Sequence, residues 1–106
     1  MGLDERLREE IVRRVLRVAA PERIIVFGSA ATGRMTGDSD IDLLIVTPSV
    51  ENARSESVRI GDALRGLGFP FDVIVMARER FAETKNVVGG IAYPASREGS
   101  ALYETA

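Results

Sequence analysis

The sequence predicts an α/β fold in which helices cover a small mixed β-sheet. Short apolar runs that are typical of buried strands alternate with segments of helical periodicity. The eleven residues 29–39 between the first two runs are slightly too few for a parallel crossover, which predicts antiparallel pairing of those strands. The longer segment 48–68, between the second and third runs, holds a full helix, as a right-handed parallel crossover requires.

The first predicted element is an amphipathic helix over residues 4–19, which Pro21 ends. Its apolar stripe consists of Leu7, Ile11, Val15 and Val18, widened by Val12, Leu16 and Ala19. Three acid–base pairs are four residues apart with the acid first, which is the favourable orientation: Asp4 with Arg8, Glu9 with Arg13, and Glu10 with Arg14. The stripe predicts that one face of this helix covers the sheet.

The remaining elements follow from apolar runs and turn residues. Strands are predicted over residues 23–27 (RIIVF), 41–46 (IDLLIV) and 71–76 (FDVIVM). Helix-start signals occur at residues 47–49 (TPS), and the helix that they begin is expected to end near Gly66 or Gly68. The C-terminal part is predicted to form helices over residues 78–85 and 90–98 and a short edge strand over residues 101–104.

Length and composition restrict the class of protein. The 106 residues are enough for one core, so residues 1–106 are expected to form a single domain. No apolar run approaches the ~20 residues of a membrane span, and the charged start MGLDERLREE is unlike a signal peptide. A cytoplasmic protein without a membrane partner is therefore expected. The net charge of −2 does not favour binding to the negatively charged backbone of a nucleic acid, so a nucleic-acid partner is not expected.

The acidic residues carry the chemistry, because zero cysteines and zero histidines exclude thiolate zinc sites and imidazole bases. Asp40 and Asp42 begin the second strand, and alternation directs both to one face, roughly 6–7 Å apart. Asp72, near the start of the third strand, would lie about 4.8 Å from one of them if the two strands are parallel neighbours. Three carboxylates so close would repel one another unless cations neutralised them, and oxygen ligands suit Mg²⁺ or Mn²⁺.

The D-x-D pattern has other interpretations. Aspartates at the start of a strand are often solvated turn residues, and Asp38 with Ser39 is typical of a turn. An EF-hand is excluded, because Leu43 stands where that loop needs Gly and Ser49 stands where it needs Glu. The pattern by itself therefore does not establish a metal site.

The segment FGSAATGR, residues 27–34, is a second candidate site. Gly28 and Gly33 have the spacing of a P-loop, but Arg34 and Met35 replace its Lys and its Ser or Thr. A strand that ends in Gly-Ser and turns into a short helix still predicts a phosphate site. Gly28 lets a phosphate approach the backbone, and Ser29 offers a hydroxyl and an amide. The alternative is an ordinary strand-ending turn.

The ordered set of these residues resembles one family. Gly28-Ser29, then ten residues, then Asp40-Ile41-Asp42, with Asp72 in a later strand, resembles the minimal nucleotidyltransferase (MNT) family of the DNA polymerase beta-like superfamily. The resemblance covers about residues 10–104, and RFAETKNVVGGIAYPASREGSALYE resembles the usual end of these small proteins. Many relatives carry Arg or Tyr and a basic residue at the positions of Ala30 and Thr32, so no basic assistance to a triphosphate is predicted from those two positions.

The resemblance implies a polymerase-beta-like fold and Mg²⁺-dependent transfer of a nucleoside monophosphate, AMP from ATP, to a hydroxyl acceptor. Under it, Asp40, Asp42 and Asp72 are catalytic and hold two Mg²⁺ ions, with Mn²⁺ as the alternative. Gly28 and Ser29 bind the nucleotide. The resemblance also implies a helical HEPN-type partner protein, with this chain as the antitoxin-like half of a toxin–antitoxin pair.

Two other functional classes stay open. A catalytically silent nucleotide-binding or partner-binding module is favoured by the small size, which leaves little surface for both a base pocket and an acceptor site. A polymerase-like or RNA-modifying enzyme is disfavoured by the acidic charge and by a content of only four Phe and two Tyr. The small size also predicts that a partner chain, or a second copy of this chain, completes the acceptor site.

Overall fold

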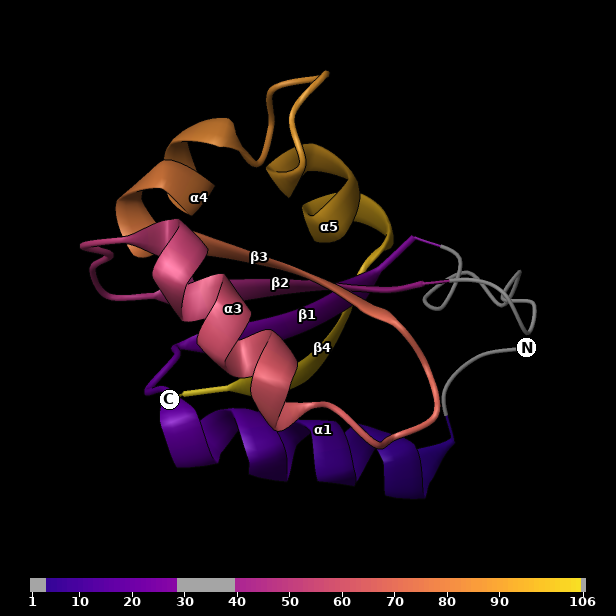
Figure 1. Ribbon diagram of the computed structural model, residues 1–106. Helices are drawn as coiled ribbons and strands as arrows, with labels where there is room; N and C mark the ends of the chain where they lie inside the picture. Colours follow the sequence, from indigo (N-terminus) through magenta and orange to yellow (C-terminus); the bar gives the residue numbers. More distant parts are fainter. Residues whose placement is uncertain (1–3, 29–39, 106) are drawn as a thin grey trace.

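The computed structural model describes residues 4–28 and 40–105 and has the predicted α/β architecture (Figure 1). The elements are α1 (Glu5–Val18), β1 (Arg23–Phe27), β2 (Ile41–Thr47), α3 (Ala53–Ala63), β3 (Phe71–Ala77), α4 (Arg78–Thr84), α5 (Ala92–Glu98) and β4 (Ser100–Glu104). The four strands form one sheet in the order β3-β2-β1-β4. β1 pairs antiparallel with β2 and β4, whereas β2 and β3 are parallel, so the predicted mixed sheet is confirmed.

The sheet lies between two layers of helices (Figure 1). Odd-numbered side chains of β2, such as Leu43 and Ile45, join the core under α1 and α3, while Leu44 and Val46 join the core under α4 and α5. The first core contains Ile11, Val15, Ile24, Val26, Ile41, Leu43, Ile45, Ile60, Leu64 and Val75. The second contains Ile25, Phe27, Leu44, Val46, Phe81, Ala92 and Ala95. Because β2 is buried on both faces, it is nearly continuously apolar after its first residues.

Helix α1 matches the predicted helix, with local differences. Asp4 is its N-cap and accepts a hydrogen bond from the Leu7 amide at 2.8 Å, so this carboxylate stabilises the first turn. Ile11 and Val15 are fully buried, as their spacing predicts. The prediction was wrong for Leu16, which is 41% exposed because it lies at the border of the stripe.

Helix α3 begins later than its predicted start at residues 47–49. Thr47 belongs to β2 instead, and its hydroxyl donates to the Ser49 carbonyl at 2.9 Å, which closes a turn. The N-cap is Asn52, whose side chain accepts a hydrogen bond from the Ser55 amide at 3.0 Å. The end is as predicted, since the C-cap Leu64 precedes Gly66 and Gly68.

The C-terminal elements lie where the sequence predicts them. Helices α4 and α5 cover one face of the sheet, and Phe81 of α4 is the large apolar side chain that anchors this layer. Strand β4 pairs with β1 and forms an edge of the sheet, as predicted for residues 101–104. Within the described residues, no helix is long and apolar enough to cross a membrane.

Candidate functional site

The predicted site residues meet where three strands lie side by side. Asp42 of β2 is the Cα partner of Phe27, the last residue of β1, and on its other side it is the Cα partner of Asp72 in β3. Gly28 directly follows β1, and Asp40 directly precedes β2. The register therefore brings four of the five predicted site residues to one end of the sheet.

Strand alternation directs the two neighbouring carboxylates to the same face. Asp42 has the parity of Leu44 and Val46, and Asp72 has the parity of Ile74 and Met76, all of which pack in the core under α4 and α5. Partner positions on adjacent strands are about 4.8 Å apart. Asp42 and Asp72 thus share the α4/α5 face, beyond the edge of its apolar core. This is the arrangement that parallel pairing of the two strands predicts.

The charges at this end of the sheet interact. Asp42 is half-buried, whereas Asp40 and Asp72 are exposed. Burial raises the pKa of the Asp42 carboxyl above its ordinary value, and the negative charges of Asp72 and then Asp40 raise that pKa further. The three carboxylates therefore form one region of negative potential, centred on Asp42.

Gly28 is in direct contact with this acidic group. Its φ of +71° lies in the left-handed region that favours glycine. A Cβ atom on Gly28 would collide with Oδ2 of Asp42, so the carboxylate lies against the bare backbone of the turn. The role predicted for Gly28 was a different one, that of letting a phosphate approach the backbone. The contact with Asp42 could have been found only by fixing the register of β1 against β2.

The other half of the predicted phosphate site lies outside the described residues. Ser29, with the predicted short helix after it, belongs to residues 29–39. The same holds for Ala30 and Thr32, where the sequence departs from the family pattern, and for Arg34. The assignment of Ser29 to nucleotide binding therefore stays a prediction.

The carboxylates suit a divalent cation by their chemistry. Their donor set consists of oxygen alone, which is the set that Mg²⁺ and Mn²⁺ prefer, and the raised pKa of Asp42 reflects negative charge that a cation would neutralise. In the conformation of residues 4–28 and 40–105, however, no group of three or more His, Cys, Asp or Glu side chains is arranged to hold a metal ion. Like charges repel one another until a cation neutralises them, so the carboxylates would approach one another only as an ion binds.

The sequence matches a known protein family. The model of a family described as nucleotidyltransferase domain matches residues 5–92, which is most of the chain and includes every described residue of the candidate site. No curated protein is similar enough in sequence to count as a match.

Solved structures share the fold at low sequence identity. A toxin–antitoxin structure with AMP-PNP has a TM-score of 0.68 at 17% identity, over 92% of this chain and 73% of that chain. A nucleotidyltransferase structure from Sulfolobus solfataricus has a TM-score of 0.63 at 22% identity, over 93% and 78%. A tri-AMPylated HEPN toxin from Shewanella oneidensis in complex with MNT antitoxin has a TM-score of 0.61 at 13% identity, over 97% and 74%. At these identities the likeness establishes the fold.

Proposed function

This chain belongs to the nucleotidyltransferase domain family, and on that premise we propose that it transfers AMP from ATP to a hydroxyl group of a partner protein. Residues 1–106 would act as one such domain. The observation that carries the proposal is the position of Asp42, which has Gly28 against its carboxylate and Asp72 as its neighbour in the parallel strand. Three separate strand ends thus supply a glycine turn and two carboxylates to one place, as transfer of a phosphoryl-bearing group requires.

We assign different roles to the three aspartates according to their exposure to solvent. Asp40, Asp42 and Asp72 would hold two Mg²⁺ ions, with Mn²⁺ as the alternative, and these ions supply positive charge that stabilises the attacking and leaving oxygens. Half-buried Asp42 is the fixed centre of the group. Exposed Asp72 is accessible to a hydroxyl of another molecule, and we assign to it the role of accepting the proton of that hydroxyl.

The transfer then proceeds as an in-line displacement. The acceptor oxygen forms a bond to the α-phosphorus as its proton passes to the carboxylate of Asp72, and the bond from the α-phosphorus to the pyrophosphate oxygen breaks. Gly28 and Ser29 are assigned to the phosphates, because a glycine at positive φ places no side chain between the backbone and an approaching anion. Pyrophosphate leaves from this turn.

The structural relatives support the choice of nucleotide and partner. One is a toxin–antitoxin structure that contains AMP-PNP, and another contains a tri-AMPylated HEPN toxin with an MNT antitoxin. We therefore propose ATP as the donor and a helical HEPN-type protein as the acceptor, with this chain as the antitoxin-like half of the pair.

A silent binding module is the second candidate. The observation that favours it is the absence, among the described residues, of a carboxylate group arranged to hold an ion. Such a module would bind a nucleotide or the partner protein and transfer nothing.

One experiment separates the two functions. The chain is incubated with ATP labelled at the α-phosphate, Mg²⁺ or Mn²⁺, and candidate acceptors that include a HEPN-type protein encoded beside it. We expect label on the acceptor, and a loss of transfer of about 100-fold or more in Asp42→Asn and Asp72→Asn, because general-base and electrostatic contributions have this size. Asp72→Asn should retain Mg-ATP binding.

The matched control is Asp62→Asn on α3. Asp62 is an exposed acid in the last turn of α3, and its ion pair with Arg65 just beyond the helix measures 3.2 Å. Because α3 covers the opposite face of the sheet from Asp42 and Asp72, loss of this pair should leave transfer unchanged. Nucleotide binding without any labelled product, for every acceptor and both metals, would contradict the transferase proposal and establish the binding module.

A further inference from the structure

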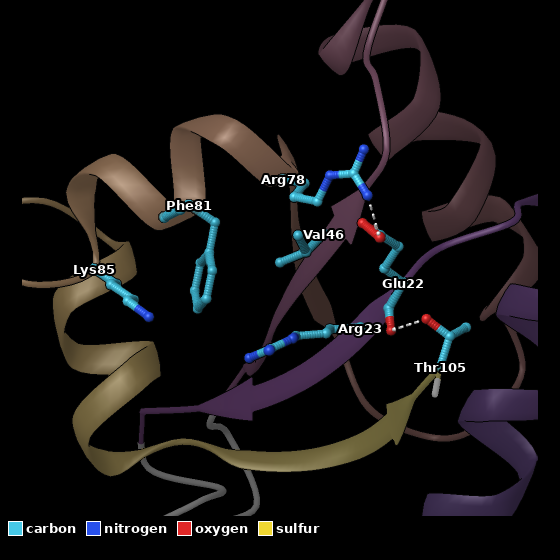
Figure 2. Close-up of a pocket in the computed structure, with 8 residues that line it drawn as sticks. Glu22, Arg23, Val46, Arg78, Phe81, Lys85 and Thr105 are labelled. Carbon is cyan, nitrogen blue, oxygen red and sulfur yellow. Dashed lines mark hydrogen bonds and ion pairs between the residues drawn. The ribbon is translucent and has the colours of Figure 1, made fainter.

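A hollow lies on the α4/α5 face of the sheet, at the end far from the carboxylates. Its position follows from the register, since Arg23 pairs with Val46 there while Phe27 pairs with Asp42 at the other end. The length of β1 separates the two ends by about 13 Å. The hollow has a volume of about 220 Å³, and its lining includes Glu22, Arg23, Arg78, Phe81, Lys85 and Thr105 (Figure 2).

The lining carries an excess of positive charge. Arg78 donates to Glu22 at 3.0 Å, and this ion pair neutralises one cation and the one acid of the lining. Arg23 and Lys85 form no ion pair with any described residue, so the hollow has two uncompensated positive charges in a chain whose net charge is −2. The cross-strand partner of Arg23 in β4 is an acid, Glu104, which lines an adjoining hollow that Arg23 and Phe81 also line, but the described side chains of Arg23 and Glu104 form no ion pair.

The two uncompensated cations are directed to the same place. The guanidinium of Arg23 lies 5.7 Å from the centroid of the Phe81 ring, which is itself almost completely buried. Figure 2 shows the side chains of Arg23 and Lys85 extending toward the same space beside that ring. An aromatic ring under a guanidinium limits its motion and excludes water from one side, which strengthens its attraction for an anion.

We propose that this hollow binds a phosphate group. A phosphate dianion has a charge close to −2 at neutral pH, which matches the two uncompensated cations. The planar guanidinium of Arg23 can donate two parallel hydrogen bonds to its oxygens, and the ammonium of Lys85 supplies a point charge on the opposite side. The phosphate is free inorganic phosphate, pyrophosphate, or a phosphate carried by a protein side chain, and all three share this chemistry.

The test uses the full chain without metal or nucleotide, so its outcome is independent of AMP transfer. Backbone amide resonances are followed by NMR during separate titrations with inorganic phosphate, pyrophosphate and O-phosphoserine, with sodium chloride at matched ionic strength as the reference. We expect saturable shifts at Arg23, Phe81 and Lys85, and smaller shifts at Gly28 and Asp42. The probe with the lowest Kd identifies which source of phosphate the hollow prefers.

Charge-removing variants make the assignment specific. Lys85→Gln and Arg23→Gln should each weaken phosphate binding by about tenfold, as expected for loss of one charge-assisted contact, and Arg23→Lys should restore part of it. Arg59→Gln is the matched control, because Arg59 is a half-exposed cation that contacts Glu56 at 3.9 Å on α3, which covers the opposite face of the sheet from the hollow. Shifts confined to Gly28 and Asp42, shifts equal to those with chloride, or an unchanged Kd in Lys85→Gln would each overturn the proposal.

Discussion

Asp42 is the residue on which the candidate site depends, and its environment is unfavourable to its own charge. Its carboxylate is half-buried, lies against the backbone of Gly28, and is flanked by Asp72 and Asp40. Burial and like charges both favour the protonated form in the folded protein. A functional site that destabilises its own fold in this way is expected where a cation or a substrate supplies the missing charge.

The raised pKa of Asp42 predicts a pH dependence of stability. Between the ordinary value of 3.8 and the raised value, the folded protein binds more protons than the unfolded chain, so stability falls as pH rises through this window. Asp42→Asn removes the charge. We expect its Tm, measured by calorimetry without metal at pH 7, to exceed that of the wild type by about 2–4 °C.

Two controls accompany this measurement. The difference in Tm should shrink as the pH is lowered toward the ordinary pKa of 3.8, because the raised pKa of Asp42 lets the wild-type carboxyl take up a proton over this range. Addition of Mg²⁺ should raise the Tm of the wild type more than that of the variant. A lower Tm for Asp42→Asn at every pH would mean that the carboxylate is structural.

Gly28 provides the second prediction at this scale. Gly28→Ala should destabilise the protein by about 1–2 kcal/mol from its positive φ alone, and by more because the new Cβ meets the carboxylate of Asp42. Gly61→Ala is the matched control: a Cβ on Gly61, within α3, would meet nothing within 4 Å, so this variant should gain about 0.5–1 kcal/mol. Urea unfolding measures both.

A double-mutant cycle tests the cause. In the background of Asp42→Ala, Gly28→Ala should cost only the part due to its positive φ, because the colliding carboxylate is gone. If Gly28→Ala lowers the free energy of unfolding equally in the wild type and in Asp42→Ala, Gly28 is needed only for the conformation of the turn.

The positions of single residues were predictable where strand alternation determines them. Their hydrogen-bond and ion-pair partners were less predictable where a side chain has several possible partners. The approach of Asp42 to Asp72 follows from period-two alternation and parallel pairing. Local choices differ: Asp4, predicted to pair with Arg8, caps α1, and Glu10 binds both Arg13 and Arg14, at 3.0 and 2.9 Å. Competing partners at spacings of three and four residues are nearly equal in energy, so the sequence alone does not decide between them.

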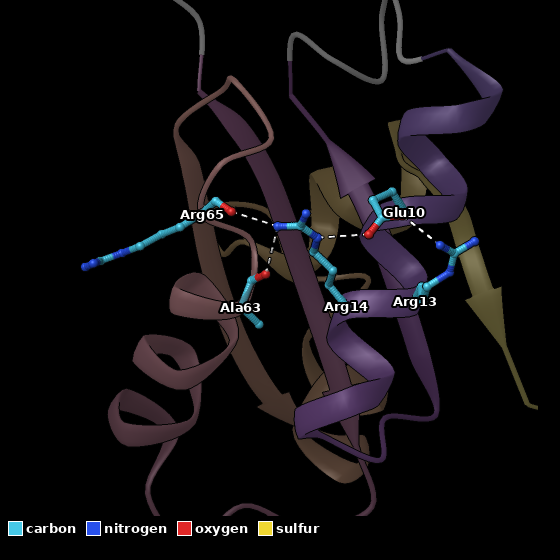
Figure 3. A network of polar contacts seen from close by, with 5 residues as sticks. All are labelled: Glu10, Arg13, Arg14, Ala63 and Arg65. Atoms are coloured by element: carbon cyan, nitrogen blue, oxygen red, sulfur yellow. Dashed lines mark hydrogen bonds and ion pairs between the residues drawn. The ribbon is translucent and has the colours of Figure 1, made fainter.

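Between elements, the main polar connection joins α1 to the end of α3 (Figure 3). Arg14 donates to the backbone carbonyls of Ala63 and Arg65 at 3.3 and 2.7 Å, and its Nε donates to Glu10. Carbonyls in the last turn of a helix have no partner within that helix. Arg14 satisfies one such carbonyl, that of Ala63 at the end of α3, and also the carbonyl of Arg65 just beyond the helix. Glu10 holds its guanidinium in position.

Arg14→Met should therefore separate this connection from the packing of the arginine stem. We expect a loss of about 1–2 kcal/mol in the free energy of unfolding, because hydrogen bonds to the end of α3 are removed. Arg13→Met is the matched control, since Arg13 is 62% exposed and, within the described part of the chain, its hydrogen bond and ion pair are with Glu10 alone. Equal effects of the two substitutions would contradict the connection.

The stabilisation from the contact between Arg14 and Glu10 is lost at low pH. The hydrogen bond from Arg14 lowers the pKa of Glu10, and the nearby charge of Arg13 lowers it further. A lowered pKa stabilises the fold above the ordinary value of 4.5, and this contribution is lost as the pH falls through the lowered value. Arg14→Met should remove most of this pH dependence, which a series of unfolding curves between about pH 2 and 6 measures.

Whole elements were predictable in type and order, and their boundaries less so. Thr47 extends β2 because its hydroxyl bonds to the Ser49 carbonyl, which competes with starting a helix there. Asn52 then caps α3, although the sequence offers an equally good signal at residues 47–49. The position of the N-cap depends on where the crossover helix must pack against the sheet, which is a tertiary constraint.

For the molecule as a whole, connection lengths were the most informative feature of the sequence. They fixed antiparallel pairing of β1 with β2 and parallel pairing of β2 with β3, and together these place the three aspartates at one end of the sheet. The basic hollow at the other end was not predictable, because Arg23 is distant in sequence from Arg78 and Lys85 and only the packing of α4 on the sheet brings them together.

Exposed apolar residues predict an assembly. Val87, Val88 and Ile91, between α4 and α5, are 54%, 77% and 40% exposed, an unusual concentration for a chain of 106 residues. We expect the chain to form a stoichiometric complex with a HEPN-type protein or with a second copy of itself. Light scattering of the purified chain and pulldown from the source cell test this. A strict monomer that recovers no stoichiometric partner would contradict it.

The parallel pairing of β2 with β3 also determines when a growing chain can first acquire the full acidic group. Gly28, Asp40 and Asp42 leave the ribosome early, but Asp72 follows only after all of α3. Until β3 joins the sheet, Asp42 borders an open strand edge and lacks its neighbouring carboxylate. In a partly synthesised chain, the carboxylate of Asp42 is therefore not repelled by that of Asp72. Any ligand that needs all three aspartates can bind only after β3 has joined the sheet.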